Sequence, residues 1–418
     1  MRIAFDRKKT ITISVIAALA LILGGAYLWY ARTYGNAEKI VLTSSEVVDY
    51  EWKSIASSHG ITGDYLWSRT RQLMIEDRED GTLIPSSYMI EGRLSYEEAE
   101  ESGVYLLSDQ ARLLKLYVKT SDRFKASDLR TEVNNRFDMS EQPPDEKAMW
   151  LEAYLYYYVS YGNADDYHKI LDLISQIFDE NGLMRPEDIS IASFDEGAFY
   201  STATYQGEEM PQSILESPAG TEYDSELVTV NAVKLSAVRL SMIRDLENNG
   251  LLPAGSYDRN LQIVTGGVAS DSIPLYAYAY QVLEDGSISY IYSGRTVATI
   301  DVGESIATMR NLAKVDALPD ASLNWIRNNI LNNGSIKSTY SIITGTTDGE
   351  EAYDSYTDIL AIAFETEDTD LYDRICTLLG VRVATYSSSP ALSMIYRQQD
   401  DRFYFTAREN LEVSLALL

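Results

Sequence analysis

Apolar residues recur at three- and four-residue steps over most of this chain, and that spacing places them along one face of a helix. The clearest case is the predicted helix from Tyr96 to Val118, whose apolar stripe consists of Val104, Leu107, Ala111, Leu114 and Val118. A stripe of this kind indicates a helix that packs one side against a hydrophobic core. Few stretches show strand-like patterns, and a single hairpin is predicted where residues 276–280 and 287–292 flank a turn at 284–286.

The predicted helices follow one another in pairs, with connections of varied length and no strict repeat period. After two helices at 44–58 and 62–74, they cover five pairs, namely 96–118 and 124–137, 145–161 and 165–178, 224–246 and 257–264, 301–313 and 319–332, and 350–364 and 368–379, followed by a last helix at 403–417. The last helix can close a ring with the first, and we count six pairs in all. This organisation predicts an all-α fold, an (α/α)6 toroid with one set of helices inside and the other outside. An open helical array is the alternative, and a division into two domains near 181–220 is not supported by a linker composition.

A basic segment and an apolar run begin the chain. Basic residues are concentrated within 1–9, and the uncharged run at 10–30 just reaches the length of about 20 residues that a membrane-spanning helix needs. Basic residues favour the cytoplasmic side, so the rest of the chain is expected outside the cytoplasmic membrane. The expected organisation is a cytoplasmic tail at 1–9, a single-pass transmembrane signal anchor at 10–30, a linker at 31–43 and the toroid at 44–418. A cleaved signal peptide is the alternative, and it gives the same location for the toroid.

Composition excludes several classes of function. The formal net charge of −28 argues against a nucleic-acid partner, because the phosphates would be repelled. His59 and His168 lack metal-ligand spacing, and the sequence has no Gly-rich phosphate loop, no HExxH and no GxSxG, so we expect no metal and no cofactor. The single cysteine, Cys376, lies in an apolar stretch and is expected to be buried. The 31 tyrosines suit carbohydrate recognition, although most of them are expected in the core.

Clusters of carboxylates begin five of the helices expected inside the ring. They are Glu97, Glu98, Glu100 and Glu101, then Asp145 and Glu146, then Glu222, Asp224 and Glu226, then Asp301 and Glu304, and finally the acidic run from Asp348 to Asp358. Acidic residues are favoured in the first turn of any helix, so capping explains each cluster taken alone. In a closed ring, however, all inner helices run in the same direction and their N-termini gather at one mouth. Carboxylates far apart in the sequence are therefore expected to converge there.

Two converging carboxylates can break a glycosidic bond. One stays protonated, because its neighbours are acidic or apolar, and donates its proton to the leaving oxygen. The other is ionised and activates water, which inverts the configuration when the two groups lie about 6.5–9.5 Å apart. In a structure, two such carboxylates would face each other across an open groove lined with tyrosine. Arginine or lysine side chains filling that groove would instead favour a binding protein.

Three segments carry a resemblance to a known group of enzymes. They are EESGVYLL with DQARLLKLYVKTSDRF at 100–124, DEKAMWLEAYLYYYVSYGNADDYHKI at 145–170, and YSGRTVATIDVGES at 292–305. In order and spacing these segments resemble inner helices of the (α/α)6 clan that contains glycoside hydrolase families 8 and 126. The individual motifs are degenerate and cover a small part of the chain.

The resemblance implies roles for individual residues. The general acid would be Glu100 or Glu101, although Ala99 stands where the clan has a serine. Asp301 would be the general base, with Asp224 in reserve. The residues implied for holding the substrate or stacking against it are Asp145, Glu146, Tyr105, Trp150 and Tyr154.

The function implied by the resemblance is inverting hydrolysis of a neutral glucan at the cell surface, with a polysaccharide or oligosaccharide as the partner. Two alternatives stay open. A toroid that kept the fold but lost the chemistry would bind glycan or serve envelope assembly; the missing serine, the absent aspartate repeat of family 8 and the membrane anchor favour it. A polysaccharide lyase on a related toroid is less compatible, because an acidic cleft repels uronates.

Overall fold

The computed structural model describes residues 38–43, 50–78, 81–94, 99–193, 226–294, 299–342, 344–347 and 349–418. The predicted membrane span at 10–30 and the predicted reserve base Asp224 lie outside these ranges. So do four other members of the acidic clusters, Glu97, Glu98, Glu222 and Asp348. Within the described ranges, no helix is both long enough and apolar enough to cross a membrane.

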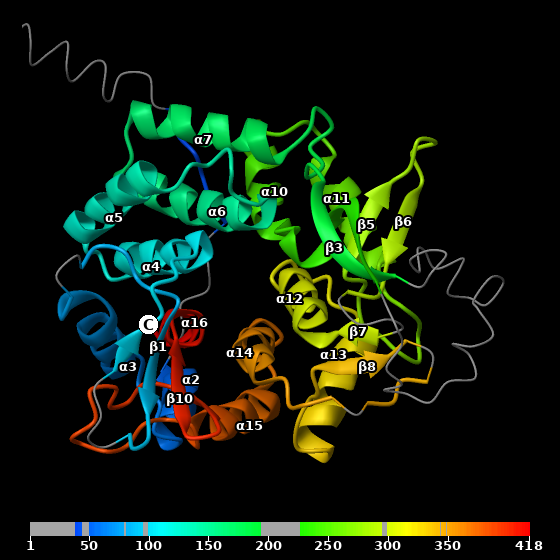
Figure 1. Ribbon diagram of the computed structural model, residues 1–418. Coiled ribbons are helices and arrows are strands. Elements are labelled where there is room, and N and C mark those ends of the chain that lie inside the picture. The colour runs from blue at the N-terminus through cyan, green and yellow to red at the C-terminus, as the bar shows by residue number, and fades with distance from the viewer. Residues whose placement is uncertain are drawn as a thin grey trace, which may run out of the picture.

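Six helices form an inner ring, and Figure 1 shows them grouped around the centre of the molecule. They are α4 (Leu107–Lys119), α6 (Pro144–Tyr161), α10 (Leu240–Asn248), α12 (Val302–Ala313), α14 (Tyr356–Glu365) and α16 (Ala407–Leu417). Contacts run all the way round, from α4 to α6, through the short turn η3 (Leu235–Ala237) to α12, then to α14, α16 and back to α4. The ring is therefore closed.

A second set of helices packs outside this ring. It consists of α5 (Arg123–Arg136), α7 (Ala164–Ile177), α11 (Ser256–Gly266), α13 (Asp320–Arg327) with η4 (Asn328–Asn332), α15 (Thr369–Gly380), and α3 (Gly63–Arg71) with η1 (Gln72–Glu76). The structure confirms the predicted (α/α)6 toroid as a mainly helical fold. The prediction of an all-α fold is wrong in one respect, because the described residues also form three β-sheets. One pairing differs from the prediction, because α16 packs mainly against α3, whereas α2 (Tyr50–Ser58) lies mainly beside α15.

Side-chain caps determine where several helices begin. The Asn163 side chain accepts hydrogen bonds from the backbone N–H groups of Asp165 and Asp166, and the Asp166 carboxylate accepts one from the N–H of Asn163. This reciprocal pair is a capping box, and it starts α7 directly after α6 ends. At α12, the Asp301 carboxylate accepts from the N–H of Glu304 at 3.1 Å. The sequence therefore encodes both the start of these helices and the short turns before them.

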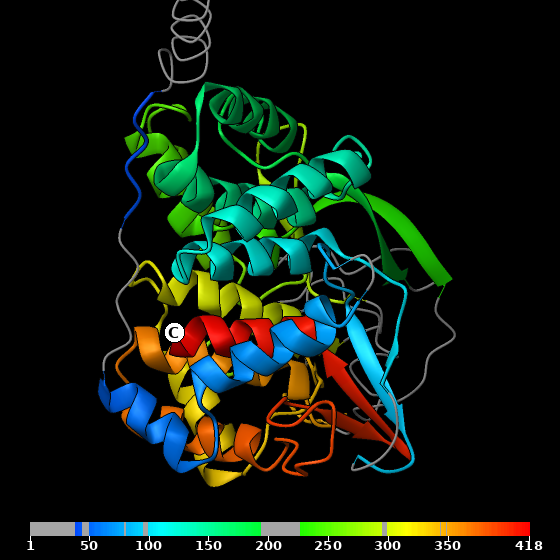
Figure 2. The same cartoon turned by 90° about the vertical axis from the view of Figure 1, so that its left-hand side faces the viewer.

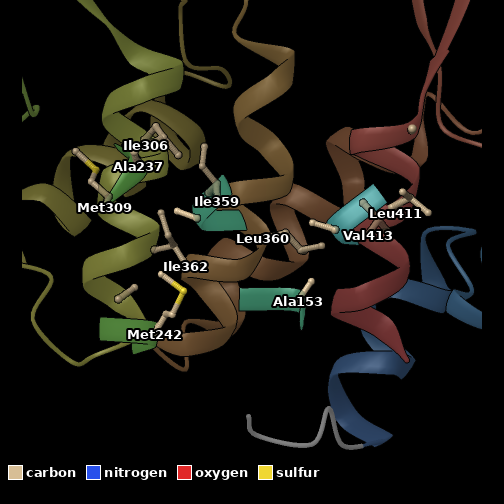
Figure 3. Close-up of a cluster of buried hydrophobic side chains, with 14 of the residues drawn as sticks. Ala153, Ala237, Met242, Ile306, Met309, Ile359, Leu360, Ile362, Leu411 and Val413 are labelled. Atoms are coloured by element: carbon tan, nitrogen blue, oxygen red, sulfur yellow. The ribbon is translucent and has the colours of Figure 1, made fainter. Parts of the chain in front are cut away.

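The hydrophobic core lies between the helices of the two rings. Figure 3 shows part of it, with labelled side chains contributed by α6, α10, α12, α14 and α16. Within α6, Trp150 and Tyr154 are completely buried, because α4 and α7 pack along that helix. The Tyr154 hydroxyl donates a hydrogen bond to Asp166 of α7 at 2.7 Å, which ties an inner helix to its outer partner.

Short sheets surround one end of the ring. They have the strand orders β2 (Glu100–Glu101), β1 (Ser87–Glu91), β10 (Arg402–Thr406), β9 (Arg397–Gln399); β3 (Glu187–Ser193), β4 (Glu226–Lys234), β5 (Ala279–Val282), β6 (Ile288–Ile291); and β7 (Thr299–Asp301), β8 (Thr339–Ser341). The predicted hairpin is confirmed as β5 and β6, with Tyr280 opposite Tyr290. Each sheet also has a strand that runs directly into an inner-ring turn or helix: β10 into α16, β4 into η3 and β7 into α12.

The predicted helix at 224–246 is wrong over most of its length. Residues 226–234 form strand β4, and the helix begins only at Leu240. The physical reason is a period-two pattern, since Val228, Val230 and Ala232 share the face that packs with Ile189 and Ile191 of the next strand. The sequence prediction had assigned these positions to a helix.

The predicted helix at 96–118 also begins too early. Its described part starts with Glu100 and Glu101 as strand β2, which pairs with β1, and α4 begins only at Leu107. Gly103 has a φ of +67°, a left-handed conformation that ends the strand and that a right-handed helix does not contain. The first acidic cluster therefore lies before the inner helix rather than on it.

Candidate functional site

A pocket of about 490 Å³ opens at the end of the ring where the inner helices begin, which we call the front mouth. Residues from the first turns of five inner helices line it: Ser108 and Asp109 of α4, Asp145 and Glu146 of α6, Glu304 of α12, Asp358 of α14, and Arg408 of α16. Ser236 of η3 completes the circle. The predicted convergence of acidic helix starts at one mouth is confirmed for these described residues.

Asp109 is a buried carboxyl group and Glu146 a partly buried one, on neighbouring helices of the front mouth. Burial raises the pKa of Glu146, and the nearby Asp145 adds to this shift, while a hydrogen bond from the N–H of Ser108 opposes it. Burial also raises the pKa of Asp109 to about 6, against the attraction of the Arg112 guanidinium. Both groups are therefore more easily protonated than a carboxyl group in water.

Glu304 faces the same pocket from α12. Its carboxylate accepts a hydrogen bond from the Ser236 hydroxyl, and Asp301 caps the backbone beneath it. Burial raises the pKa of Glu304, Asp301 and Asp145 raise it further, and Ser236 and the Lys234 ammonium oppose the shift. Glu304 is thus a third carboxyl group that is more easily protonated than a carboxyl group in water.

Asp145 differs from these neighbours because it has an ion-pair partner. The Lys234 ammonium lies 2.9 Å from its carboxylate, and the backbone N–H of Glu146 donates to the same side chain at 2.8 Å. The negative charge of Asp145 contributes to the raised pKa of Glu146, of Glu304 and of Glu187, whose pKa burial and Asp145 together bring to about 7. One charged carboxylate is therefore surrounded by carboxyl groups that hold protons more tightly.

A chain of ion pairs forms the floor of the pocket. Arg310 lies 2.7 Å from both Asp358 and Glu412, and Glu412 is also 2.7 Å from Arg112. Arg408 lies 2.9 Å from Asp358. Arg310 and Arg112 outweigh the effect of burial and hold the pKa of Glu412 well below its usual range. These guanidinium groups are occupied by protein carboxylates and connect four inner helices.

The predicted general acids lie beside the pocket rather than in it. Side chains alternate between the two faces of a strand, and directly opposite residues share a face. Glu101 is opposite Tyr88, faces away from the pocket, and has the Arg78 guanidinium at 2.6 Å. Glu100 is opposite Met89, on the same face as Ser87, which lines the pocket. Glu100 is therefore the exposed carboxylate at the rim, and its role as acid stays a prediction.

The predicted base Asp301 is used as a helix cap, next to the pocket-lining Glu304. Asp224, the reserve, lies outside the described residues. Asp145 and Glu146, predicted to hold substrate, both line the pocket. The structure thus brings the acidic starts of α6 and α12 together at the pocket. From α12, however, it is Glu304 and not Asp301 that lines the pocket.

The predicted stacking walls are wrong for two of three residues. Trp150 and Tyr154 are completely buried in the packing of α6, so no ligand ring can reach them. Tyr105 is half-buried, and its hydroxyl accepts a hydrogen bond from Arg78 outside the pocket. No described residue that lines the pocket is aromatic, which contradicts the expected tyrosine-lined groove.

Several pocket residues were not predicted from the sequence, namely Asp109, Arg239, Arg397 and Arg408. Arg408 and Glu412 stand four residues apart in the last helix, a spacing that places both on one face and that signals a charged inner surface. Among the described residues, no group of three or more His, Cys, Asp or Glu side chains is arranged to hold a metal ion.

Similarity to known proteins is limited to structure. No family model matches the sequence, and no curated protein matches it. An α-amylase from Clostridium perfringens has the same fold: it is 12% identical, the alignment covers 87% of this chain and 97% of that chain, and the TM-score is 0.59. At this identity the likeness shows a shared fold and nothing more.

Two further solved structures align over similar lengths. They are an endo-β-1,4-glucanase from Acetobacter xylinum, 10% identical over 79% of this chain and 97% of that chain with a TM-score of 0.45, and a family 8 enzyme with xylobiose from Teredinibacter turnerae, 10% identical over 81% and 97% with a TM-score of 0.44. At these TM-scores they add nothing to the fold assignment, which rests on the first structure.

Proposed function

We propose that this chain is a membrane-anchored, extracytoplasmic glycoside hydrolase that cleaves a neutral glucan with inversion at the front mouth. The observation that carries the proposal is the contrast between carboxyl groups in one pocket. Asp145 is ion-paired with Lys234, whereas burial and the charge of Asp145 raise the pKa of Glu304 on another helix. When one carboxyl group has a raised pKa and its neighbour is ion-paired, the first is suited to act as the acid and the second as the base.

Each group then has a defined task. The protonated carboxyl of Glu304 donates its proton to the leaving glycosidic oxygen, so the bond breaks without expelling an unstable alkoxide. The carboxylate of Asp145 accepts a proton from the attacking water on the other side of the sugar. Lys234 forms an ion pair with Asp145, and the Ser236 hydroxyl orients Glu304.

A neutral substrate fits the charge of the protein. At a formal net charge of −28, the chain repels polyanionic glycans over distances of about one Debye length, roughly 8–10 Å at physiological ionic strength. The arginines at the pocket floor are ion-paired with Asp358 and Glu412, so they offer no free cation to a uronate.

The test is release of reducing ends from a panel of neutral α- and β-glucans by the full chain. We expect the Glu304→Gln variant to lose about 10²–10⁴-fold in rate, the range for removal of a general acid or base. Asp145→Asn is expected to lose a similar amount, and Glu141→Gln, an exposed carboxylate near the start of α6, keeps full activity. Proton NMR of the first product identifies the anomer, which inversion requires to be opposite to that of the substrate.

A catalytically inactive toroid that binds glycan is the second candidate, and two observations favour it. Arg239, Arg397 and Arg408 line the pocket, and no described lining residue is aromatic. If a folded protein releases no reducing ends from any glucan but still binds one by calorimetry, the hydrolase proposal is overturned in favour of this candidate.

The proposed location rests on the sequence at 10–30, whose uncharged run follows a basic segment. Alkaline carbonate extraction of membranes tests it: an anchored chain stays in the membrane pellet, and a chain with a cleaved signal peptide is found in the supernatant.

A further inference from the structure

Residues 38–43, which we call the strap, are the first described residues of the chain, and they are bound tightly to the toroid. The Tyr158 hydroxyl donates to the backbone oxygen of Glu38 at 2.6 Å, and the Tyr167 hydroxyl donates to its carboxylate at 3.0 Å. Ile40 is buried, with 5% of its surface exposed. The strap is therefore hydrogen-bonded to α6 and α7 and also buries an apolar side chain.

The second half of the strap is held by the end of α10. The Asn249 side chain accepts from the N–H of Val41 and donates to the Val41 carbonyl, both at 2.8 Å, as a neighbouring strand would. The Asp245 carboxylate accepts from both the N–H and the hydroxyl of Thr43. The sequence predicted a linker over these residues. In a flexible linker, however, the backbone groups would not be hydrogen-bonded to side chains of the domain.

These contacts all lie at the end of the ring opposite the front mouth. Tyr158 is in the last turn of α6, and Asp245 and Asn249 are at the end of α10. A cavity of about 250 Å³ beneath the strap is lined by Leu42 and Thr43, and by residues from the ends of α12 and α14. Figure 2 agrees, with the strap, in blue, on the side where α16 ends and the strands β1 and β10 on the other side. We call this end the back mouth.

We infer that the strap fixes the toroid on its anchor with the back mouth toward the lipid bilayer and the front-mouth pocket opening away from it. The inference rests on the membrane anchoring proposed above. Residues 31–37 separate the expected span from the strap, and a chain of seven residues reaches at most about 25 Å. Because the strap is fixed to the back of the ring, this short connection holds that side near the membrane. The pocket then faces glycan outside the cell.

Energy transfer from single fluorescent labels to acceptor lipids tests this orientation. The full chain is reconstituted in vesicles and labelled at Asn248→Cys, at the back mouth, or at Ser102→Cys, at the front mouth; both positions are exposed. The native Cys376 is buried, and burial raises the pKa of its thiol to about 12, so it stays unlabelled at neutral pH. Flotation of the vesicles first establishes whether the chain is anchored.

We expect transfer from position 248 to be at least about twofold more efficient than from position 102, since an inner helix of 18 residues separates the two mouths by roughly 27 Å. The double variant Asn249→Ala and Tyr167→Phe releases the strap and is expected to reduce this difference. Asn332→Ala, at an exposed surface asparagine, is the matched control and leaves the difference unchanged.

Two results overturn the inference, and they are distinguishable. If the chain fails to float with the vesicles, the proposed anchoring fails and the orientation fails with it. If the chain floats but the two labels transfer equally, or the front label transfers better, only the orientation is wrong and the anchoring and hydrolase proposals stand.

Discussion

At the scale of single residues, Asp145 influences several other carboxyl groups at the front mouth. Its charge raises the pKa of Glu146, Glu187 and Glu304, and its own charge is stabilised by one lysine, Lys234. Neither Asp145 nor Glu304 is distinctive as a residue of a helix start, where acidic side chains are common. Their difference comes from burial and from Lys234, which approaches from a strand almost 90 positions further along the chain.

The pH profile of the hydrolysis follows from these contacts. Glu304 must be protonated to act, so activity is present below its raised pKa and is lost as the pH rises through it. Lys234 lowers the pKa of Glu304, so the Lys234→Met variant should move the basic limb of kcat/KM to higher pH. A basic limb that stays in place or moves to lower pH would show that Glu304 is not the proton donor.

The residue scale also shows the limit of sequence reasoning. Asp145 and Glu146 were correctly expected at the mouth, because helix direction follows from the ring. The choice of Asp301 over Glu304 was not correct for the pocket, since the N-cap position turns the Asp301 carboxylate back toward its own helix. Trp150 and Tyr154 were expected as sugar platforms, but α6 is packed from both sides.

At the scale of elements, the inner helices are tied together by charges as well as by apolar contacts. Arg112 of α4, Arg310 of α12, Asp358 of α14 and Glu412 of α16 form one connected set of ion pairs. Removing one partner from a buried ion pair leaves an uncompensated charge, which costs more than the pair itself contributes. The closure of the ring therefore depends on Glu412, which bridges two arginines.

We predict that Glu412→Gln lowers the free energy of unfolding by about 3–5 kcal/mol at pH 7 in urea denaturation. The folded-state pKa of Glu412 is lowered, so its stabilising effect is present above the unfolded-state pKa of about 4.3 and is lost as the pH falls through the folded-state value. The difference between variant and native protein should thus shrink in acid. Glu91→Gln, in an exposed pair with Arg402, is the control and should change stability by less than about 0.5 kcal/mol. An equal loss in both variants would contradict a special role for the buried pairs.

Helices were predicted well where an apolar stripe begins directly after a capping residue or a proline. They were predicted poorly where a strand precedes an inner helix. The capping box at Asn163 and the proline at position 144 mark helix starts that the structure confirms. The segments that contain β2 and β4 were assigned to helices, because each short strand lies just before the turn or loop that leads into an inner helix and was taken as part of that helix. Pairing of β2 with β1 and of β4 with β3 depends on partners elsewhere in the chain, which a local pattern does not contain.

At the scale of the whole molecule, the closed ring explains why the acidic helix starts meet. One consequence was foreseen, the convergence at a single mouth, and one was not, the arginine-rich floor. A protein with a formal net charge of −28 places several of its 35 basic residues inside the ring, where they offset inner carboxylates. The strap at residues 38–43 is bound to the opposite end of the ring, so the two ends of the toroid differ in what they contact.

The most direct test of the central claim is a crystal structure of the Glu304→Gln variant with a bound glucan oligosaccharide that the native protein cleaves. We expect a glycosidic oxygen within hydrogen-bond reach of the amide at position 304, about 2.6–3.2 Å, and a water between the sugar and Asp145. A sugar chain bound at another surface, with the front-mouth pocket free of it, would contradict the account.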